Sequence, residues 1–430
     1  MNREIVAAWK HRELRILVVG EGVSMFGSLV ARLALPWTAA RELHQGTLSV
    51  GLVFLAELLP SALLGLFAGA LVDRWSRRRV LIVSNLMLAI ATAVVPVLAG
   101  LDRLTMTAIY AIGLVSGCIA PFFRAAFRST VPITVPRESF AGAQSIIQGV
   151  SATAELAAFA AAGWLVHVFG GPAGLAIDAG SFVWAGAVTM LLKPTPAALI
   201  AQHRTNVVTE LREGARYVRR HAVLGPIALS SVIAGVGGGM VGSVVIVHVT
   251  KTLGYDTGPQ GVVYAIGGVG SLFAAAYAPR VLAAFGLQRT IVVALIATAP
   301  AMALMAFAPG PSLLGYSMLV GQQVIADPVG TVSLVAYGTV VAAGSPEAMR
   351  GRVESTVSVL GTLGLAIGFV AGGLLGEPRV LGTTATLFGG GLITAIAAIC
   401  LAGPNVRKIH GAGDVAVVSG RNTSRGRLAV

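Results

Sequence analysis

Three carboxylic acids lie inside long apolar stretches of this sequence, where ionised side chains are rare. They are Glu21, Glu155 and Asp327. An ionised carboxyl group is costly in an apolar medium, so a carboxyl at such a depth is a candidate functional site. A carboxyl that an opening cavity alternately hydrates and dries can take up and release a proton. We therefore predict these three acids as candidates for proton coupling.

Asp327 has the most polar surroundings of the three. It is followed by Pro328, which frees a backbone carbonyl group, and preceded by Gln322 and Gln323, which add amide donors. These features predict a substrate-binding position at Asp327, with Gln322 and Gln323 lining the substrate cavity. The alternative role for Asp327 is a hydrogen bond within a helix kink. The alternative for Glu21 is pairing with the basic N-terminal residues.

Two opposite charges, Arg32 and Glu57, are predicted at the same depth in neighbouring helices, because an α-helix rises about 1.5 Å per residue. They are candidates for the substrate cavity, either as a gating or anion-binding pair or as a fixed ion pair that only stabilises the fold. Glu21 precedes Arg32 by eleven residues, about three helical turns, so both face the same side. Asp178 falls near the predicted outer end of a helix and is assigned to folding or gating, outside the site.

Membrane helices must position these side chains. The 430 residues are 55% hydrophobic and 11% charged, with a mean hydropathy of +0.82, which is more apolar surface than a soluble protein can cover. A helix needs about 20 largely apolar residues to cross the hydrocarbon core. Such windows occur at 15–41, 49–72, 80–100, 105–125, 142–166, 174–192, 222–249, 258–280, 288–308, 312–341, 355–375 and 381–402.

These twelve windows predict an all-α membrane protein made of two six-helix bundles, at 1–192 and 222–403. The longest polar stretch, 193–221, is predicted to be a cytoplasmic linker that includes a surface-lying helix. Residues 404–430 are expected to form a disordered cytoplasmic tail. Glycines at 361, 364, 368 and 372 form a small-residue stripe, which we interpret as close packing within one chain, so we expect a monomer.

The basic residues are distributed unevenly over the two sides of the membrane. Of the 31 Lys and Arg residues, 26 lie on the side of both termini, four lie on the opposite side, and Arg32 lies inside a helix. The positive-inside rule therefore predicts that both termini are cytoplasmic, in a multi-pass protein of the inner or plasma membrane. Topology and anionic lipids account for the formal charge of +13, so we expect no nucleic-acid partner.

Several classes of protein are excluded by missing motifs. Cys118 and Cys400 lie in apolar runs, whereas a disulfide or zinc framework needs paired cysteines in polar loops. None of the four lysines follows a glycine, as a phosphate-binding loop requires, and the sequence has no His-Glu-x-x-His pair. We therefore expect no enzyme, no cofactor and no metal.

The loop after the second window carries the most specific short motif. It reads GALVDRWSRRR over residues 69–79 and resembles the loop signature of the major facilitator superfamily. Four further segments are similar to the macrolide-efflux and siderophore-export branch of that superfamily, which contains drug:proton antiporters. They are GEGVSMFGSLVARLALP at 20–36, PITVPRESFAGAQSIIQ at 132–148, IDAGSF at 177–182 and RGRV at 350–353.

This resemblance implies a secondary transporter in which two bundles rock about a central cavity. The loop would then be a conformational switch formed by Gly69, Asp73, Arg74, Arg77 and Arg78. Gly69 would permit close helix packing, and Asp73 would meet the start of the eleventh helix in the outward-facing state. The fifth window lacks the Gly-Pro-rich segment that many proton antiporters carry at this place.

The leading functional hypothesis is proton-driven export of an amphipathic small molecule, such as a drug or a macrolide-like or siderophore-like compound. Its partners would be that substrate, protons and membrane lipids. A lipid or lysolipid flippase and an uncoupled facilitator of a small metabolite are the alternatives, because a cavity poor in aromatic residues tolerates acyl chains. Arg32 would favour an anionic substrate if it is unpaired, and the acids a cationic one, so the charge of the substrate stays open.

Overall fold

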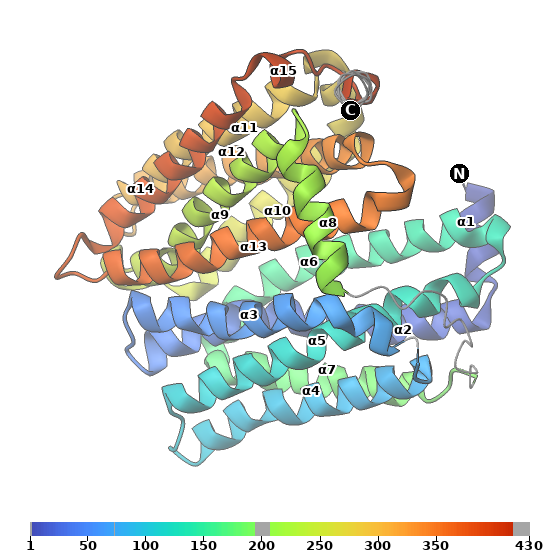
Figure 1. Ribbon diagram of the computed structural model, residues 1–430. Helices are drawn as coiled ribbons and strands as arrows, with labels where there is room; N and C mark the ends of the chain where they lie inside the picture. Colours follow the sequence, from blue (N-terminus) through green and yellow to red (C-terminus); the bar gives the residue numbers. More distant parts are fainter. Residues whose placement is uncertain (1, 73, 194–206, 416–430) are drawn as a thin grey trace. The chain divides into compact units, whose positions relative to one another are not determined.

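The computed structural model describes residues 2–72, 74–193 and 207–415, which fold into helices and connecting loops (Figure 1). The α-helices are α1 (Asn2–Trp9), α2 (Arg12–Trp37), α3 (Thr47–Val72), α4 (Arg77–Gly100), α5 (Met106–Thr134), α6 (Phe140–Phe169), α7 (Gly171–Thr189), α8 (Val207–Arg220), α9 (Leu224–Val247), α10 (Thr257–Phe285), α11 (Leu287–Ala306), α12 (Leu313–Gly344), α13 (Arg350–Leu375), α14 (Gly382–Ile396) and α15 (Pro404–Arg407).

In the described part of the chain, eleven helices are long and apolar enough to cross a membrane. They coincide with eleven of the predicted windows. The remaining window, 174–192, is occupied by α7, whose 19 residues include Asp178 and several glycines that lower its hydropathy. The all-α membrane architecture that the sequence predicts is therefore confirmed.

The largest difference in helix bounds is in α5. Its predicted window ends at residue 125, whereas the helix continues to Thr134. Arg124 and Arg128 interrupt the apolar run, but Arg124 donates to the hydroxyl of Ser61 on α3 at 2.5 Å, so a contact within the protein satisfies this charge and the helix continues past it. An apolar window therefore underestimates a helix that continues beyond the hydrocarbon core.

The chain forms two compact units, each described here by itself. Unit 1 comprises residues 1–45, 53–203 and 256–265, and unit 2 comprises residues 46–52, 204–255 and 266–430. In unit 1, α2 packs against α6 and α7, and α4 packs against α5 and α7. In unit 2, α9 packs against α13 and α14, and α11 packs against α12 and α14. The predicted boundaries had assigned the first turns of α3 and of α10 to the opposite bundles.

Glycine allows α9 and α13 of unit 2 to approach each other closely. A Cβ atom added at Gly364 would overlap the carbonyl oxygen of Val232, and one added at Gly368 would overlap that of Val236. By contrast, a Cβ atom at Gly361 would meet nothing nearer than 3.9 Å. The predicted small-residue stripe thus packs within the chain, and glycine is required for this packing at 364, 368 and 372 but not at 361.

The helices α2 and α9 end in the same uncommon way. A π-helical turn, η1 (Thr38–Glu42), follows α2, and another, η3 (His248–Thr252), follows α9. The N–H of Leu43 donates to the carbonyl oxygen of Thr38 at 3.2 Å, and that of Leu253 donates to His248 at 2.9 Å. Because π-helical turns are rare, their recurrence after the first membrane helix of each half indicates an internal repeat.

The prediction of a disordered tail from residue 404 is wrong for residues 404–415. Val406, Ile409 and Val415 are at most 2% exposed and belong to the hydrophobic core of unit 2. The Asp414 carboxylate accepts the N–H groups of Gly411 and His410, both at 2.9 Å, and these bonds hold the pKa of Asp414 below its usual range. Three spaced apolar side chains suffice to anchor this polar stretch, while residues 416–430 lie outside the described part.

Candidate functional site

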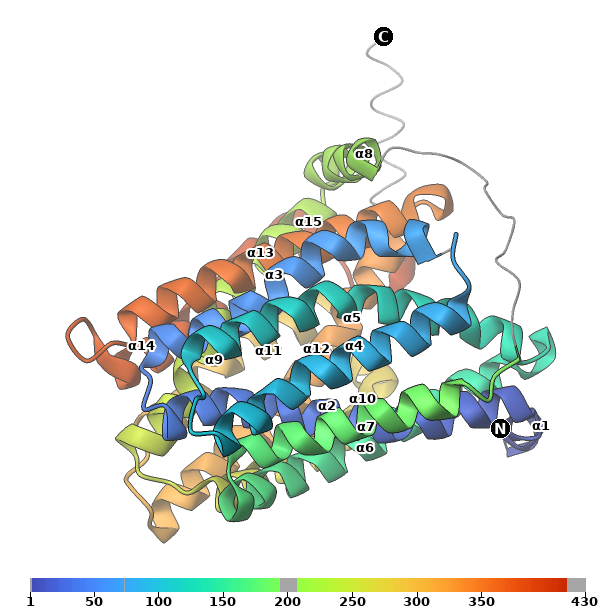
Figure 2. The same cartoon turned by 90° about the horizontal axis from the view of Figure 1, so that it is seen from below.

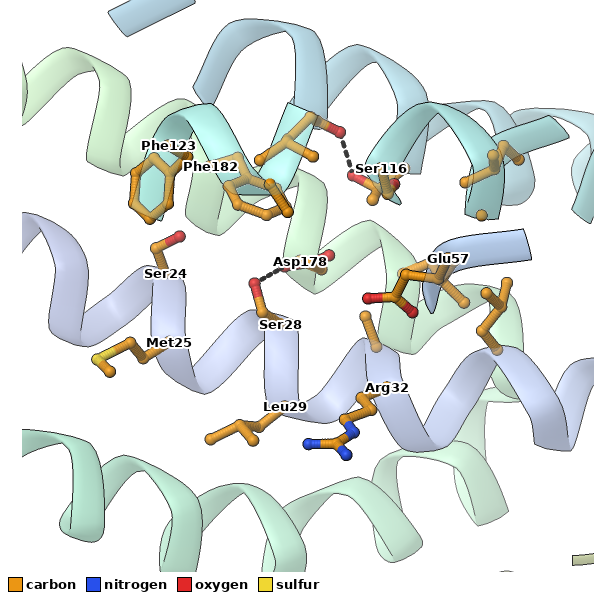
Figure 3. A pocket seen from close by; sticks show the side chains of 18 of the residues that line it. Ser24, Met25, Ser28, Leu29, Arg32, Glu57, Ser116, Phe123, Asp178 and Phe182 are labelled. Carbon is orange, nitrogen blue, oxygen red and sulfur yellow. Dashed lines mark hydrogen bonds between the residues drawn. The ribbon is translucent and has the colours of Figure 1, made fainter. Parts of the chain in front are cut away.

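A cavity of about 450 Å³ lies within unit 1 (Figure 3). Side chains from six helices, α2 to α7, line it. Most of its walls are apolar or carry hydroxyl groups, as expected of a site for a small organic molecule. The charged residues of its lining are Glu21, Arg32, Glu57, Arg124, Glu155 and Asp178.

One face of α2 supplies four of the polar residues that line this cavity. Glu21, Ser24, Ser28 and Arg32 follow one another at intervals of three or four residues, so they project from the same side of the helix. All four line the cavity. The predicted common face of Glu21 and Arg32 is therefore the cavity face of α2.

Glu21 is the most enclosed of the predicted acids, at 4% exposed. Its neighbour on α4 is Asn85, which is 0% exposed. Within the described residues, Glu21 Oε1 and both polar atoms of the Asn85 amide have no hydrogen bond of normal geometry. Buried polar atoms whose only polar neighbours are badly aligned are costly, so this position is suited to an exchangeable proton, water molecule or ligand.

Asp178 was predicted to lie near water, outside the site, but it is 3% exposed and lines the cavity. Ser28 of α2 donates to its carboxylate at 3.1 Å (Figure 3). Ser181, one turn along α7, donates to its backbone carbonyl at 2.8 Å. A Cβ atom added at Gly27 would collide with Ser181, so α2 and α7 pack closely here. The segment IDAGSF, singled out by its resemblance, contains both Asp178 and Ser181 and could have indicated this position.

Arg32 and Glu57 both line the cavity, but within the described part of the chain no ion pair joins them. They lie apart in Figure 3, on α2 and α3. Glu57 instead interacts electrostatically with Arg124 and Asp178. Equal depth in the membrane does not fix the direction in which a side chain leaves its helix, so the predicted pairing did not follow.

Glu155 lies on α6, where it is exposed and lines the cavity. One turn before it, Ser151 donates to the backbone carbonyl of Ile147 at 2.8 Å and approaches the sulfur of Met25 at 3.5 Å. Thus four of the residues predicted from the sequence share one cavity: Glu21, Arg32, Glu57 and Glu155.

The remaining predicted residues lie in unit 2, on α12. The Gln323 amide donates to Asp327 Oδ2 at 3.1 Å, and Thr331 donates to the Asp327 carbonyl at 2.9 Å. A Cβ atom added at Gly267 of α10 would lie 3.1 Å from the carboxyl carbon of Asp327, so α10 covers this carboxyl group. Gln322 is 3% exposed, and its Oε1 has no partner among the described residues.

The predicted switch loop is described in part, because Asp73 lies outside the described residues. Arg78 donates to the carbonyl oxygen of Met190 at 2.5 Å, which satisfies the C-terminal end of α7. Arg74 is exposed, and Arg77 begins α4. A Cβ atom at Gly69 would meet nothing within 4 Å among the described residues, so close packing does not require glycine there.

The described residues contain no group of three or more His, Cys, Asp or Glu side chains that could hold a metal ion. The polar groups of the unit 1 cavity are carboxyls, hydroxyls and guanidinium groups. Such groups can bind and exchange protons and can orient a polar or charged ligand.

Comparison with known proteins gives relatives along most of the chain. Multidrug efflux pump Tap of Mycolicibacterium fortuitum is 27% identical over 355 residues, which are 80% of this chain and 83% of that protein. Macrolide efflux protein A of Streptococcus pyogenes is 23% identical over 203 residues, and YfiS of Bacillus subtilis, an uncharacterized MFS-type transporter, is 25% identical over 215 residues. The chain spans about half the length of these last two proteins, 50% of each.

Solved structures share the fold. The chain superimposes on a bacterial homologue of the iron transporter ferroportin with a TM-score of 0.71 and 16% identity, covering 90% of this chain and 98% of that one. The nucleoside transporter NupG gives a TM-score of 0.69 at 14% identity, covering 96% and 98%. These likenesses confirm the fold that the resemblance implied.

A family model also matches the chain. The model of the Major Facilitator Superfamily matches residues 17–326, well over half of the chain. Its members are transporters and not enzymes, and the relatives that resemble this chain include drug and macrolide efflux proteins. The chain is therefore a multi-pass membrane transporter that belongs to the Major Facilitator Superfamily.

Proposed function

We propose that this transporter exports an amphipathic small molecule, such as a drug or a macrolide-like or siderophore-like compound, in exchange for protons. The observation that carries the proposal is the cavity of unit 1, which holds a buried carboxyl group, Glu21, with an oxygen atom that lacks a partner among the described residues. An ionised carboxyl without a partner is costly inside a membrane, and a proton or a positively charged group removes that cost. Proton and substrate would use this carboxyl in turn.

The lining of the cavity supports an amphipathic substrate. Its apolar surface suits a hydrophobic body, and the hydroxyl groups of Ser24, Ser28 and Ser116 suit polar substituents. Four acids and two arginines line it, so the formal charge favours protons and cationic groups over anions. The names of Tap and of macrolide efflux protein A support export as the direction.

Asp327 and Glu155 are the other proton-coupling candidates. Asp327 differs from Glu21 because Gln323 donates a hydrogen bond to it and α10 covers it. We propose that Asp327 responds to the conformational cycle in unit 2, while Glu21 responds to the substrate in unit 1. Alternating access would couple the two groups, and the loop residues Arg74, Arg77 and Arg78 would act on that cycle.

The distribution of basic residues supports an inner or plasma membrane location with both termini in the cytoplasm. The close packing of α9 on α13 uses the glycine stripe within one chain, which is consistent with a monomer. The two bundles 1–192 and 222–403, joined by the linker 193–221, remain our proposal for the parts that move against each other.

The experiment that tests the proposal is flux driven by a pH gradient in proteoliposomes. Wild type, Glu21→Gln and Asp327→Asn would be compared with Glu347→Gln, which removes an exposed acid outside the membrane helices. We expect wild type and Glu347→Gln to move an amphipathic substrate in the direction opposite to the flow of protons down their gradient. Glu21→Gln should abolish coupled flux, because the amide cannot exchange a proton.

Each outcome of this flux assay has a defined meaning. Normal gradient-driven flux in both carboxyl variants would refute proton coupling through Glu21 and Asp327. Flux that ignores the gradient in wild type would favour an uncoupled facilitator. Movement of labelled phospholipid between leaflets in place of the drug panel would favour a flippase.

A further inference from the structure

The helix α8 is fixed where three membrane helices end. It stops at Arg220, and α9 begins at Leu224. The Tyr217 hydroxyl donates to the carbonyl oxygen of Gly344, the last residue of α12, at 3.0 Å. Near the start of α13, Arg352 forms an ion pair with Glu213. Because all three partners are ends of membrane-spanning helices, α8 must lie at the boundary between the hydrocarbon core and water.

The inner face of α8 packs tightly against unit 2. A Cβ atom at Gly214 would lie 2.7 Å from the carbonyl oxygen of Arg352, so the two backbones are in close contact. Val218 is 3% exposed and belongs to the core of unit 2. In both views α8 crosses the direction of α13 as a separate outer layer (Figures 1 and 2). The helix is thus held as a rigid surface element parallel to the boundary.

The outer face of α8 is basic. Arg212, Arg216, Arg219 and Arg220 are all exposed. They follow one another at intervals of four, three and one residues, which places them on one side of an α-helix. Glu213 borders this face, and its charge is paired with Arg352 of α13; the side chain of Glu210 lies outside the described residues. The four residues form what we call the arginine face.

We propose that the arginine face of α8 is a binding site for the headgroups of anionic phospholipids. A planar guanidinium group donates two parallel hydrogen bonds to a phosphate, which makes arginine well suited to this ligand. The site is at the depth of the headgroups, because α8 is attached to three helix ends. Each basic residue near an anionic leaflet strengthens association by about fivefold.

Through the contacts of α8, bound lipid can affect the stability of the membrane helices of unit 2. Headgroups that bind the arginine face would hold α8 against the membrane surface. Since α8 is joined to α13 by the Glu213–Arg352 pair and to α12 by Tyr217, bound lipid would stabilise the ends of both helices. This inference does not depend on which substrate is carried, because neither the arginine face nor its contacts include a residue of the cavity.

The test uses the purified full chain in proteoliposomes that contain spin-labelled phosphatidylglycerol or spin-labelled phosphatidylcholine. Electron spin resonance gives the fraction of each label held at the protein, and so the preference for the anionic lipid. We expect wild type to prefer phosphatidylglycerol. The variant with all four arginines of α8 changed to glutamine should lose this preference by at least about tenfold.

Two further variants make the result specific. Changing the same four residues to lysine keeps the charge, so most of the preference should remain. The variant R103Q/R379Q removes two exposed arginines from other loops and should leave the preference intact. Circular dichroism and gel filtration would show that each variant is folded.

Three results would overturn the proposal. One is an unchanged preference in the folded four-glutamine variant. Another is an equal loss in R103Q/R379Q, because the preference would then reflect net charge alone. The third is displacement of the spin-labelled phosphatidylglycerol from wild type by inorganic phosphate as effectively as by unlabelled phosphatidylglycerol. The arginine face would then bind free anions and not the membrane.

Discussion

Replacing Gly368 by alanine should destabilise unit 2, because this glycine lies at the closest approach of α9 and α13. The new Cβ atom would overlap the Val236 carbonyl oxygen and would lie 2.9 Å from the Cα atom of Gly239. To bring this Cβ atom to an ordinary contact distance of 3.4 Å from the Gly239 Cα atom, α9 and α13 must move apart by roughly 0.5 Å or more. Overpacking of this kind costs about 1 to 3 kcal/mol, whereas alanine gains about 1 kcal/mol over glycine in a helix.

The matched control is Gly361→Ala, two turns earlier on α13, where the new Cβ atom would meet nothing nearer than 3.9 Å. This variant keeps the gain in helix propensity without the overlap, so it should be as stable as wild type or up to about 1 kcal/mol more stable. Gly368→Ala should fall below it by about 2 kcal/mol. Thermal unfolding of both proteins in the same detergent measures the difference. Equal midpoints would refute the packing that we infer.

Two further predictions concern single hydrogen bonds. His221 is buried, its Nδ1 accepts the N–H groups of Val223 and Leu224, both at 3.1 Å, and burial lowers its pKa below 6.5. The contribution of His221 to stability should therefore be full above about pH 6.5 and decrease as the pH falls through the folded-state pKa. His221→Asn can still accept a hydrogen bond but cannot be protonated, so it should flatten this pH dependence in melting scans. An unchanged slope would contradict the assignment. Ser28→Ala should destabilise unit 1 by about 1 kcal/mol in melting scans, because the Asp178 carboxylate loses a donor. The control is Ser129→Ala, which removes a hydroxyl that donates only to its own helix and should change the melting temperature little.

Most of the fold could be predicted from the sequence, because a helix that crosses a membrane needs a minimum length of about 20 largely apolar residues. The window at 49–72 and α3 (Thr47–Val72) agree within two residues for this reason. The rule fails where a helix leaves the hydrocarbon core. The last nine residues of α5 and the packed segment 404–415 contain charges or turns, and only tertiary contacts make them ordered.

The site was predicted less completely than the fold. Depth along a helix follows from counting residues, so Glu21 and Arg32 could be placed on one face of α2. Direction across the bundle depends on how neighbouring helices rotate, which a sequence does not specify. Arg32 and Glu57 therefore share a cavity without pairing, and Asp178, assigned to a wet helix end, lies buried beside Ser28.

The packed segment after α14 also constrains the order in which the protein can mature during its synthesis. Val406, Ile409 and Val415 follow every membrane helix in the chain, so they leave the ribosome after α9, α11 and α12 have been made. Until they arrive, the apolar groups around Leu224 and Val340 have no cover at this end of unit 2. During this time the helices of unit 2 would be incompletely packed and accessible to chaperones and proteases. A chain that ends by premature termination between residues 401 and 406 would therefore contain the membrane helices of unit 2 but lack the side chains that complete its core.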